Sequence, residues 1–235
     1  DGANYNEKVV IDKSLTLQGV DSSTVILDGT GLSAGNGTAG NGSGIVINVG
    51  ITNVTIKKMT VKNYLGFSGN QDAGIYGTGQ NDGLNISKVA IVNNVGGSGF
   101  YANGPVNGIT ISNVTSTGHT IGARGIVVWN GFKQNINISN CHVYGNNCCG
   151  IELQDGTASG VTMSNNNVHD NGDNGLALLG LKAGAGANII SNNTVTNNGR
   201  FGIEIKNPNG NGTTSGDGSI YLDNNTVTFT PSVGM

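Results

Sequence analysis

Acidic residues that could carry out acid–base chemistry are few in this chain, and two of them are spaced as a pair. The sequence has 235 residues but only three Glu, and Glu152 and Glu204 occupy equivalent positions of an internal repeat. Hydrolysis of a glycosidic bond uses one carboxylic acid and one carboxylate, on either side of that bond. Glu152 and Glu204 are therefore candidate catalytic residues, with Asp173 between them as a third member.

The basic residues suit a second chemistry, which is β-elimination or epimerisation of a uronic acid. That reaction needs a base for the proton beside the carboxylate and a cation that stabilises the developing charge. Arg124, Arg200 and Lys206 are candidates for both roles. Calcium prefers hard oxygen ligands, and the sequence predicts a calcium site among the carboxylates Glu152, Asp155, Asp170 and Asp173. The alternative for residues 169–175 is an ordinary Asn/Asp/Gly turn.

Aromatic and amide side chains accompany these charges and suit recognition of a sugar. Aromatic rings stack on the apolar faces of sugar rings, and amides hydrogen-bond to hydroxyl groups. The single Trp lies two residues after a position that carries Tyr in other repeats. The candidate substrate-binding residues are Tyr76, Tyr101, Asn103, Trp129 and Gln154.

The elements that must position these residues are short strands in a repeat of about 25 residues. A Gly followed by an aliphatic residue or Phe recurs seven times between Gly44 and Ile203, at intervals of 25 to 30 residues. Each pair is followed by a second alternating run, such as Ile136-Asn137-Ile138, and then by a third run. Three period-two strands in each unit, without a helical segment, predict stacked coils that bury one another's inward residues. An antiparallel β-sandwich with evenly spaced turns is the alternative.

Alternation assigns a direction to the side chains of each strand. After each Gly the aliphatic residue points inward, so the next residue points outward. One outward column therefore contains Tyr101, Glu152 and Glu204, and Arg124 and Arg200 lie at the corner that precedes it. This concentration predicts a groove for an extended polysaccharide on the first sheet. The alternative is a solvated face whose charges only keep the sheet soluble.

The asparagine excess has an architectural explanation. The chain has 36 Asn and 41 Gly, and Ser-Asn pairs recur at the corner after the second strand. Asn tolerates the left-handed backbone conformation of a sharp bend, and its amide can bond to the equivalent Asn of the next coil. We therefore assign corner residues such as Asn113, Asn140 and Asn165 to the scaffold rather than to catalysis.

The cycle of Gly-Ile, Ile-x-Ile-Ser-Asn and Val-x-x-Asn over residues 44–230 resembles the right-handed parallel β-helix proteins of the pectate-lyase-like superfamily. Residues 5–11, 15–19 and 24–29 look like the first coils common to this group. The expected fold is an all-β solenoid of about eight or nine coils with three short parallel sheets. The superfamily includes lyases, hydrolases, epimerases, esterases and non-catalytic rods, so the resemblance specifies chemistry weakly. The clustered Asp-Asp signature of its pectin hydrolases is absent from this sequence.

The two ends of the coil stack are expected to lack the usual caps. The N-terminal helix that usually caps such a solenoid is not visible in the sequence, and neither is a C-terminal cap. We expect residues 1–235 to form a single β-helix domain that is a segment of a longer protein. Uncapped ends expose strand edges, which predicts end-to-end or adjoining-domain contacts.

Composition restricts the partners and the location. Eleven basic against 14 acidic residues give a net charge of −3, and the lack of a basic patch disfavours nucleic acid. No apolar run approaches the roughly 20 residues of a membrane span. Cys141, Cys148 and Cys149 are expected to be free thiols in a core or turn, because their spacing does not suit zinc. The style of the repeat indicates a secreted or cell-surface protein of bacteria or archaea.

The sequence thus predicts a carbohydrate-active protein that binds an extended, neutral or acidic polysaccharide. The leading hypothesis is a polysaccharide lyase or epimerase, or a glycoside hydrolase, with calcium as the one cofactor considered. The alternative is a non-catalytic surface or adhesin rod, or a carbohydrate-binding stalk. In that case the Arg124–Glu152 and Arg200–Glu204 pairs are only cross-coil ion pairs, each contributing about 0–1 kcal/mol.

Overall fold

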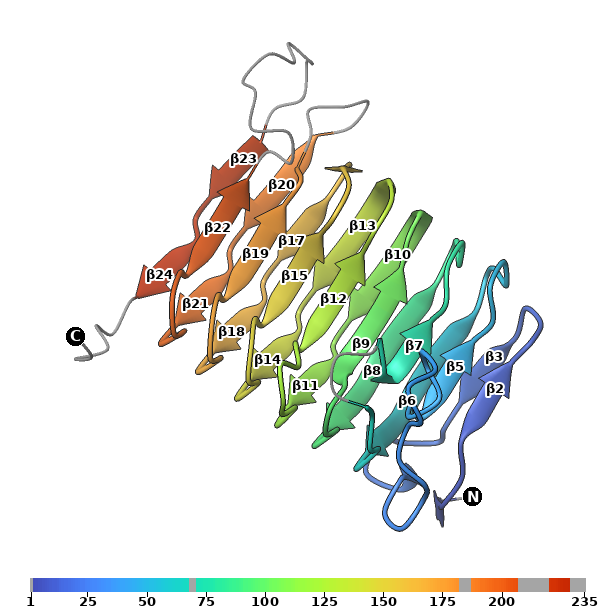
Figure 1. The fold of residues 1–235 in the computed structure, drawn as a ribbon. Helices are drawn as coiled ribbons and strands as arrows, with labels where there is room; N and C mark the ends of the chain where they lie inside the picture. Colours follow the sequence, from blue (N-terminus) through green and yellow to red (C-terminus); the bar gives the residue numbers. More distant parts are fainter. Residues whose placement is uncertain (1, 68–70, 182–186, 207–219, 229–235) are drawn as a thin grey trace.

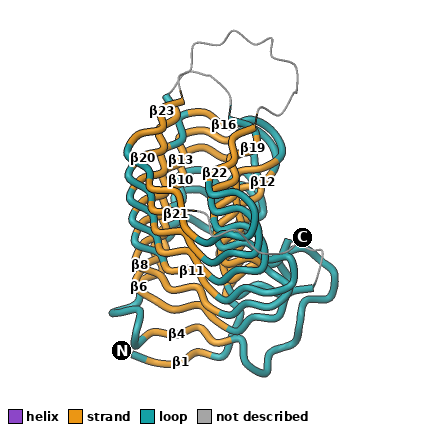
Figure 2. The backbone as a smooth tube through the Cα atoms, turned by 90° about the vertical axis from the view of Figure 1, so that its left-hand side faces the viewer, coloured by secondary structure: helices purple, strands orange, loops and turns teal. Residues whose placement is uncertain are grey.

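The protein is a rod of short strands stacked along one axis (Figure 1). The computed structural model describes residues 2–67, 71–181, 187–206 and 220–228, and the regular elements in these ranges are all β-strands. Within the same ranges, no helix is long and apolar enough to cross a membrane. Figure 2, turned by 90° from Figure 1, shows the strands of successive turns lying one above another.

The strands belong to two hydrogen-bonded sheets. One sheet has eight strands: β2 (Val9–Ile11), β5 (Ile45–Ile47), β7 (Ala73–Gly77), β9 (Ser98–Asn103), β12 (Ile126–Trp129), β15 (Ile151–Gln154), β19 (Leu176–Leu179) and β22 (Ile203–Lys206). The other has 16 strands: β1 (Ala3–Tyr5), β3 (Thr16–Gln18), β4 (Val25–Asp28), β6 (Thr55–Lys62), β8 (Asn85–Val92), β10 (Val106–Ser112), β11 (Thr115–Thr117), β13 (Lys133–Ser139), β14 (His142–Tyr144), β16 (Ala158–Ser159), β17 (Thr162–Ser164), β18 (Asn167–His169), β20 (Asn188–Ser191), β21 (Thr194–Thr196), β23 (Ile220–Asp223) and β24 (Thr226–Thr228).

Parallel pairing confirms the expected fold class, an all-β parallel β-helix. Five of the described turns carry three separate strands, and the turn from β15 to β18 carries four. In two turns the second and third sides run on as the single strands β6 and β8. These long strands join two sides of the rod into one sheet, so the structure has two sheets where the sequence predicted three. The bend inside each long strand lies at Lys58 or Lys88, whose φ angles are 57° and 54°.

One continuous hydrophobic core runs inside the rod from Ile11 to Val195. One column lies on the eight-stranded sheet, where Phe100, Ile126 and Ile151 are paired in register and fully buried. Burying one such side chain stabilises a fold by about 1.5–3 kcal/mol. The inward column predicted from the Gly-aliphatic pairs is therefore part of the core that holds successive turns together.

The Gly of each pair is required by close packing at the corner. A Cβ atom on Gly150 would lie 2.4 Å from Val168 Cγ1, and one on Gly175 would lie 2.3 Å from Val195 Cγ1. Real Cβ atoms do not approach carbon that closely, so only Gly lets the backbone meet the Val of the third side. The Gly-aliphatic repeat is thus a packing signature.

Two neighbouring asparagines have different structural roles at the corner after the second side. Asn113, Asn165 and Asn192 take the left-handed conformation, with φ of 54° to 55°. The buried ladder, however, is formed by the next residue along the chain: Asn166 Nδ2 donates to Asn193 Oδ1 at 2.9 Å. The sequence correctly predicted the bend, and the predicted bond between corner asparagines forms where Asn224 Nδ2 donates to Asn192 Oδ1 at 2.6 Å. The buried ladder at the next residue was not predicted.

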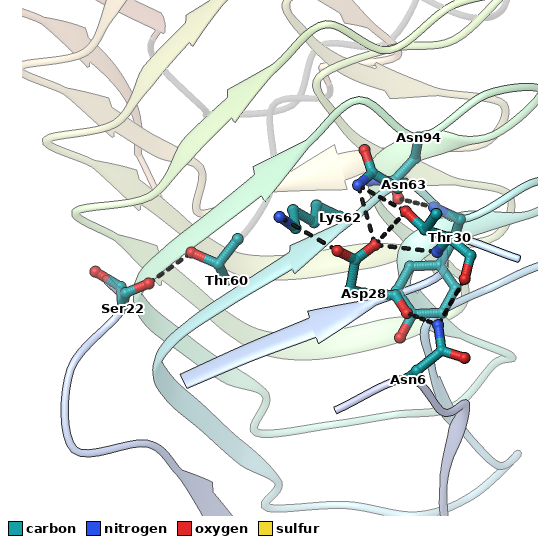
Figure 3. A network of polar contacts seen from close by, with 9 residues as sticks. Asn6, Ser22, Asp28, Thr30, Thr60, Lys62, Asn63 and Asn94 are labelled. Carbon is teal, nitrogen blue, oxygen red and sulfur yellow. Dashed lines mark hydrogen bonds and ion pairs between the residues drawn. The ribbon is translucent and has the colours of Figure 1, made fainter. Parts of the chain in front are cut away.

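The first turns are joined by hydrogen bonds that converge on Asp28 (Figure 3). Asp28 Oδ1 accepts from Thr30 Oγ1 at 2.7 Å and from Asn63 Nδ2 at 3.0 Å, and Lys62 Nζ lies 3.2 Å from Oδ2. Asn6 Nδ2 donates to the Asp28 carbonyl at 2.7 Å. Although burial opposes ionisation, these partners hold the pKa of Asp28 well below its ordinary value. This carboxylate is part of the scaffold.

The last described turn leaves apolar residues exposed. Leu222 and Val227 pair with the buried Ile190 and Val195 of the preceding turn, yet both are exposed. Contacts with a neighbouring domain or copy at this end remain a prediction.

Candidate functional site

The outward column predicted on the eight-stranded sheet is present in the structure. Tyr101 pairs with Val127, Val127 pairs with Glu152, and the column continues through Ala177 to Glu204. A parallel sheet brings equivalent residues of successive turns side by side, which explains why the repeat alone predicted this alignment.

The side chains of this column are largely buried, although alternation directs them away from the core. Tyr101 is 5 % exposed and Glu152 is 3 % exposed. A Cβ atom on Gly40 would lie 2.5 Å from Tyr76 Cδ1, so a loop backbone packs directly on that ring. Trp129 is covered on one side by Arg124. Corner residues and loops therefore cover much of this sheet face.

An aromatic cluster forms the floor of the candidate site. The rings of Tyr76 and Tyr101 are 5.5 Å apart and tilted by 57°, and those of Tyr101 and Trp129 are 6.2 Å apart and stacked at 11°. Arg124 Cζ lies 4.7 Å from the Trp129 ring, within cation–π range. Trp129 Nε1 donates to Asp155 Oδ2 at 2.5 Å, which fixes the orientation of the indole. Burial raises the pKa of Tyr76 to about 12.

An open pocket of about 520 Å³ lies over this cluster. Its lining includes Gln71, Ser98, Tyr101, Arg124, Trp129 and Asn130, together with the corners at 96–97 and 121–123. The sequence predicted three of these residues and missed Gln71, Ser98 and Asn130. Gln71 and Asn130 lie just outside a strand and Ser98 is the first residue of β9, where the period-two pattern assigns no direction.

The two predicted amide ligands lie beside the pocket rather than in its lining. Asn103 and Gln154 are the register partners of Trp129 on either side. Asn103 Oδ1 accepts from Asn130 Nδ2 at 2.7 Å, so this amide positions a pocket residue.

The ion pair that the non-catalytic alternative expected between Arg124 and Glu152 is present, and its partly buried Arg124 lines the pocket. Arg124 Nε donates to Glu152 Oε2, and Arg124 Nη1 donates to the Gly122 carbonyl at 3.0 Å. Burial raises the pKa of the Glu152 carboxyl above its ordinary value, and the Arg124 guanidinium offsets part of this effect. Glu152 is therefore a buried carboxylate that depends on one basic partner.

The predicted ion pair between Arg200 and Glu204 is wrong, because Glu204 pairs with Lys206. Glu204 Oε1 lies 2.7 Å from Lys206 Nζ, and Asn174 Nδ2 donates to Glu204 Oε2 at 2.7 Å. Arg200 instead lies over Phe201, with Cζ 4.8 Å from the ring centroid. Lys206 is closer because it follows Glu204 by two residues on β22, where alternation puts both on the same face.

The carboxylates predicted to bind calcium do not form one cluster. Asp170 Oδ2 lies 2.6 Å from His169 Nδ1 on the third side of the rod, and Asp155 accepts from Trp129. Among the described residues, the His, Cys, Asp and Glu side chains that converge as a group are Cys148, Cys149 and Asp173. The predicted set of oxygen ligands is therefore not assembled in this structure.

Comparison with known proteins places this geometry in a family. A sequence model described as "Right handed beta helix region" matches residues 41–228. A solved variant of the periplasmic alginate epimerase AlgG is 15 % identical, with a TM-score of 0.46 over 80 % of this chain and 47 % of that chain. A second structure of that epimerase is 12 % identical, with a TM-score of 0.38 over 79 % of this chain and 62 % of that one. This chain thus spans about half to three fifths of these structures. No curated protein matches the sequence.

Proposed function

The chain belongs to the family of right-handed β-helix proteins, and on that premise we propose that it binds a polysaccharide in the pocket over Tyr101 and Trp129. The observation that supports this proposal most directly is the stacked pair of rings at the pocket floor, with Arg124 beside it. Flat apolar rings bordered by polar groups suit a sugar, which has an apolar face and hydroxyl edges.

The polar lining suits the same kind of ligand. Gln71, Ser98 and Asn130 lie at the pocket and offer donors and acceptors to hydroxyl groups. The guanidinium of Arg124 can bind the carboxylate of an acidic sugar through two parallel hydrogen bonds. Because the pocket lining comes from three successive turns, we propose that the chain of the polysaccharide continues over the neighbouring turns. We further propose that the protein acts at the cell surface or after secretion, where such polymers occur.

Replacing Trp129 should weaken polysaccharide binding. Trp129 is the single Trp of the chain, so quenching or a shift of its emission during titration reports binding in the wild type. In Trp129→Ala, affinity electrophoresis should show binding weakened by at least about tenfold, because a buried aromatic anchor contributes about 2 kcal/mol or more. Phe132→Ala is the matched control, since Phe132 is an exposed aromatic outside this pocket.

The panel for this titration should contain neutral glucans, galactans and polyuronates. Equal affinity of Trp129→Ala and the wild type would exclude the aromatic floor as the binding site. If no polysaccharide binds, the non-catalytic structural rod is the better interpretation.

Catalysis at the same site is a second candidate function, favoured by Glu152. A buried carboxyl with a raised pKa is typical of a general acid or base. In this proposal Asp173, Glu204, Arg124, Arg200 and Lys206 are further candidates for the acid, base or neutralising roles of hydrolysis or of elimination and epimerisation.

The products formed from the polysaccharide distinguish hydrolysis, elimination and epimerisation. Incubation with the panel, with and without calcium, should yield new reducing ends for hydrolysis and additional ultraviolet absorbance of an unsaturated product for elimination; NMR of the polymer detects epimerisation. Glu152→Gln should lower the rate by at least about 100-fold, whereas Glu7→Gln, which changes a Glu outside this sheet, should not. Binding without turnover would leave a carbohydrate-binding protein that is not an enzyme.

A further inference from the structure

Two adjacent cysteines and an aspartate meet at the corner that precedes the eight-stranded sheet. The backbone N–H of Asp173 donates to the Cys148 carbonyl at 3.1 Å, so Asp173 occupies the position of Cys148 one turn further along the rod. Cys149 is buried, whereas Cys148 and Asp173 are partly exposed. Neither cysteine forms a disulfide.

The spacing of the three side chains fits a metal ion. Cys148 Sγ lies 3.6 Å from Cys149 Sγ, and the two sulfur atoms and one Asp173 oxygen all lie within 4.8 Å of one another. With Zn–S distances of about 2.3 Å, two thiolates of a tetrahedral zinc site are about 3.8 Å apart. The observed separation of the sulfur atoms is close to this value.

We propose that Cys148, Cys149 and Asp173 form a binding site for a divalent cation of the zinc class. Thiolate ligands select zinc and related soft or borderline ions, whereas calcium and magnesium prefer oxygen ligands alone. Three protein ligands leave the fourth tetrahedral position to water or another small ligand, and partly exposed Cys148 and Asp173 give the ion access from solvent.

The charge around the site supports a cation bound by thiolates. Two thiolates and one carboxylate carry three negative charges, so a bound divalent ion leaves a net charge of −1. Arg124 lies close enough to both cysteines to interact with them electrostatically. Its positive charge can balance the remaining negative charge, in addition to pairing with Glu152.

The sequence did not predict this site, because the third ligand is separated from the cysteines by one whole turn of the rod. Cys148 and Cys149 are adjacent and lack the paired Cys-x-x-Cys spacing that identifies common zinc sites. Only the stacking of successive turns brings Asp173 beside them.

The test is a zinc titration of the full chain, reduced and freed of metal, in competition with a chromogenic chelator. We expect one equivalent of zinc to bind in the wild type. Cobalt in place of zinc should give thiolate-to-cobalt charge-transfer absorption together with the intense visible bands of a tetrahedral site. Both Cys148→Ser and Asp173→Asn should weaken zinc binding by at least about tenfold.

Two variants serve as matched controls. Cys141→Ser changes a buried cysteine elsewhere in the core and should leave zinc binding unchanged. His142→Gln removes one member of the imidazole pair formed with His169, whose Nε2 atoms are 2.7 Å apart and offer a competing site. Zinc binding that persists in Cys148→Ser, or that is lost in His142→Gln, would overturn the proposal, as would the absence of binding to the wild type. Circular dichroism of each variant checks that it is folded.

Discussion

Lowering the pH from 7 to 4 should destabilise the wild-type protein by about 3 kcal/mol more than the variant His119→Asn. His119 is fully buried, and burial lowers its pKa to about 3. The unfolded chain, with an ordinary histidine pKa of about 6.5, binds more protons than the folded chain between these two values. Stability is therefore lost as the pH falls through this window, by about 1.4 kcal/mol per unit.

The hydrogen bonds of His119 require the neutral ring. Its Nδ1 accepts from the backbone N–H of Asn94 at 3.1 Å, and its Nε2 lies 3.0 Å from Ser116 Oγ. Ser116 Oγ donates its own proton to the Gly125 carbonyl at 2.8 Å, so the ring proton is on Nε2. Protonation of Nδ1 would break the bond to Asn94 and leave a buried charge.

His119 also interrupts a ladder of buried amides. One turn further along, Asn146 Nδ2 donates to Asn171 Oδ1 at 2.9 Å, whereas the ring of His119 accepts from the backbone of Asn94 and not from its side-chain amide. Asn94 Nδ2 is accordingly a buried side-chain atom without a hydrogen-bond partner among the described residues. An unsatisfied buried donor costs about 1–3 kcal/mol.

The double variant Ser116→Val/His119→Asn should therefore be more stable than the wild type at pH 7. It places at positions 116 and 119 the Val and Asn that the next turn carries at the equivalent positions, Val143 and Asn146. Urea unfolding at pH 7 and pH 4 measures both effects, and His142→Asn is the control because His142 is only partly buried. If the wild type and His119→Asn lose the same stability on acidification, the neutral buried ring is not the cause.

The sequence predicted the features that depend on the repeat itself. Fold class, the inward column and the outward alignment from Tyr101 to Glu204 all follow from period-two alternation and parallel stacking. The burial of that outward column could not be predicted, because the loop at Gly40 and the side chain of Arg124 cover it through contacts that the repeat does not encode.

The same limit applies to individual partners in the site. Arg124 and Glu152 belong to neighbouring turns, and their pairing followed from stacking. Arg200 and Glu204 are instead only four residues apart at the start of one turn, and Lys206 on the same strand pairs with Glu204. Which of two basic side chains pairs with a carboxylate depends on distances of a few ångströms. The spacing of residues in the sequence does not give distances to that precision.

Arg124→Met should lower the free energy of unfolding at pH 7 by about 3 kcal/mol, because it leaves the buried Glu152 carboxylate without its partner. Glu152 has a side chain that is only 4 % exposed, so water cannot replace the guanidinium. The loss should shrink as the pH falls, since protonation of Glu152 removes the unpaired charge. Denaturant unfolding between pH 7 and pH 4 measures this trend, and unchanged stability at pH 7 would contradict it.

The double variant Arg124→Met/Glu152→Gln separates the structural role of Arg124 from its role in binding. With the unpaired charge removed, most of the lost stability should return, and the double-mutant cycle gives the coupling energy of the pair. We expect this stable variant still to bind acidic polysaccharides more weakly than the wild type, because it lacks the guanidinium beside Trp129. Affinity for neutral polysaccharides should change less. Equal affinity of the double variant and the wild type for polyuronates would show that Arg124 stabilises the fold by pairing with Glu152 and does not bind the polysaccharide.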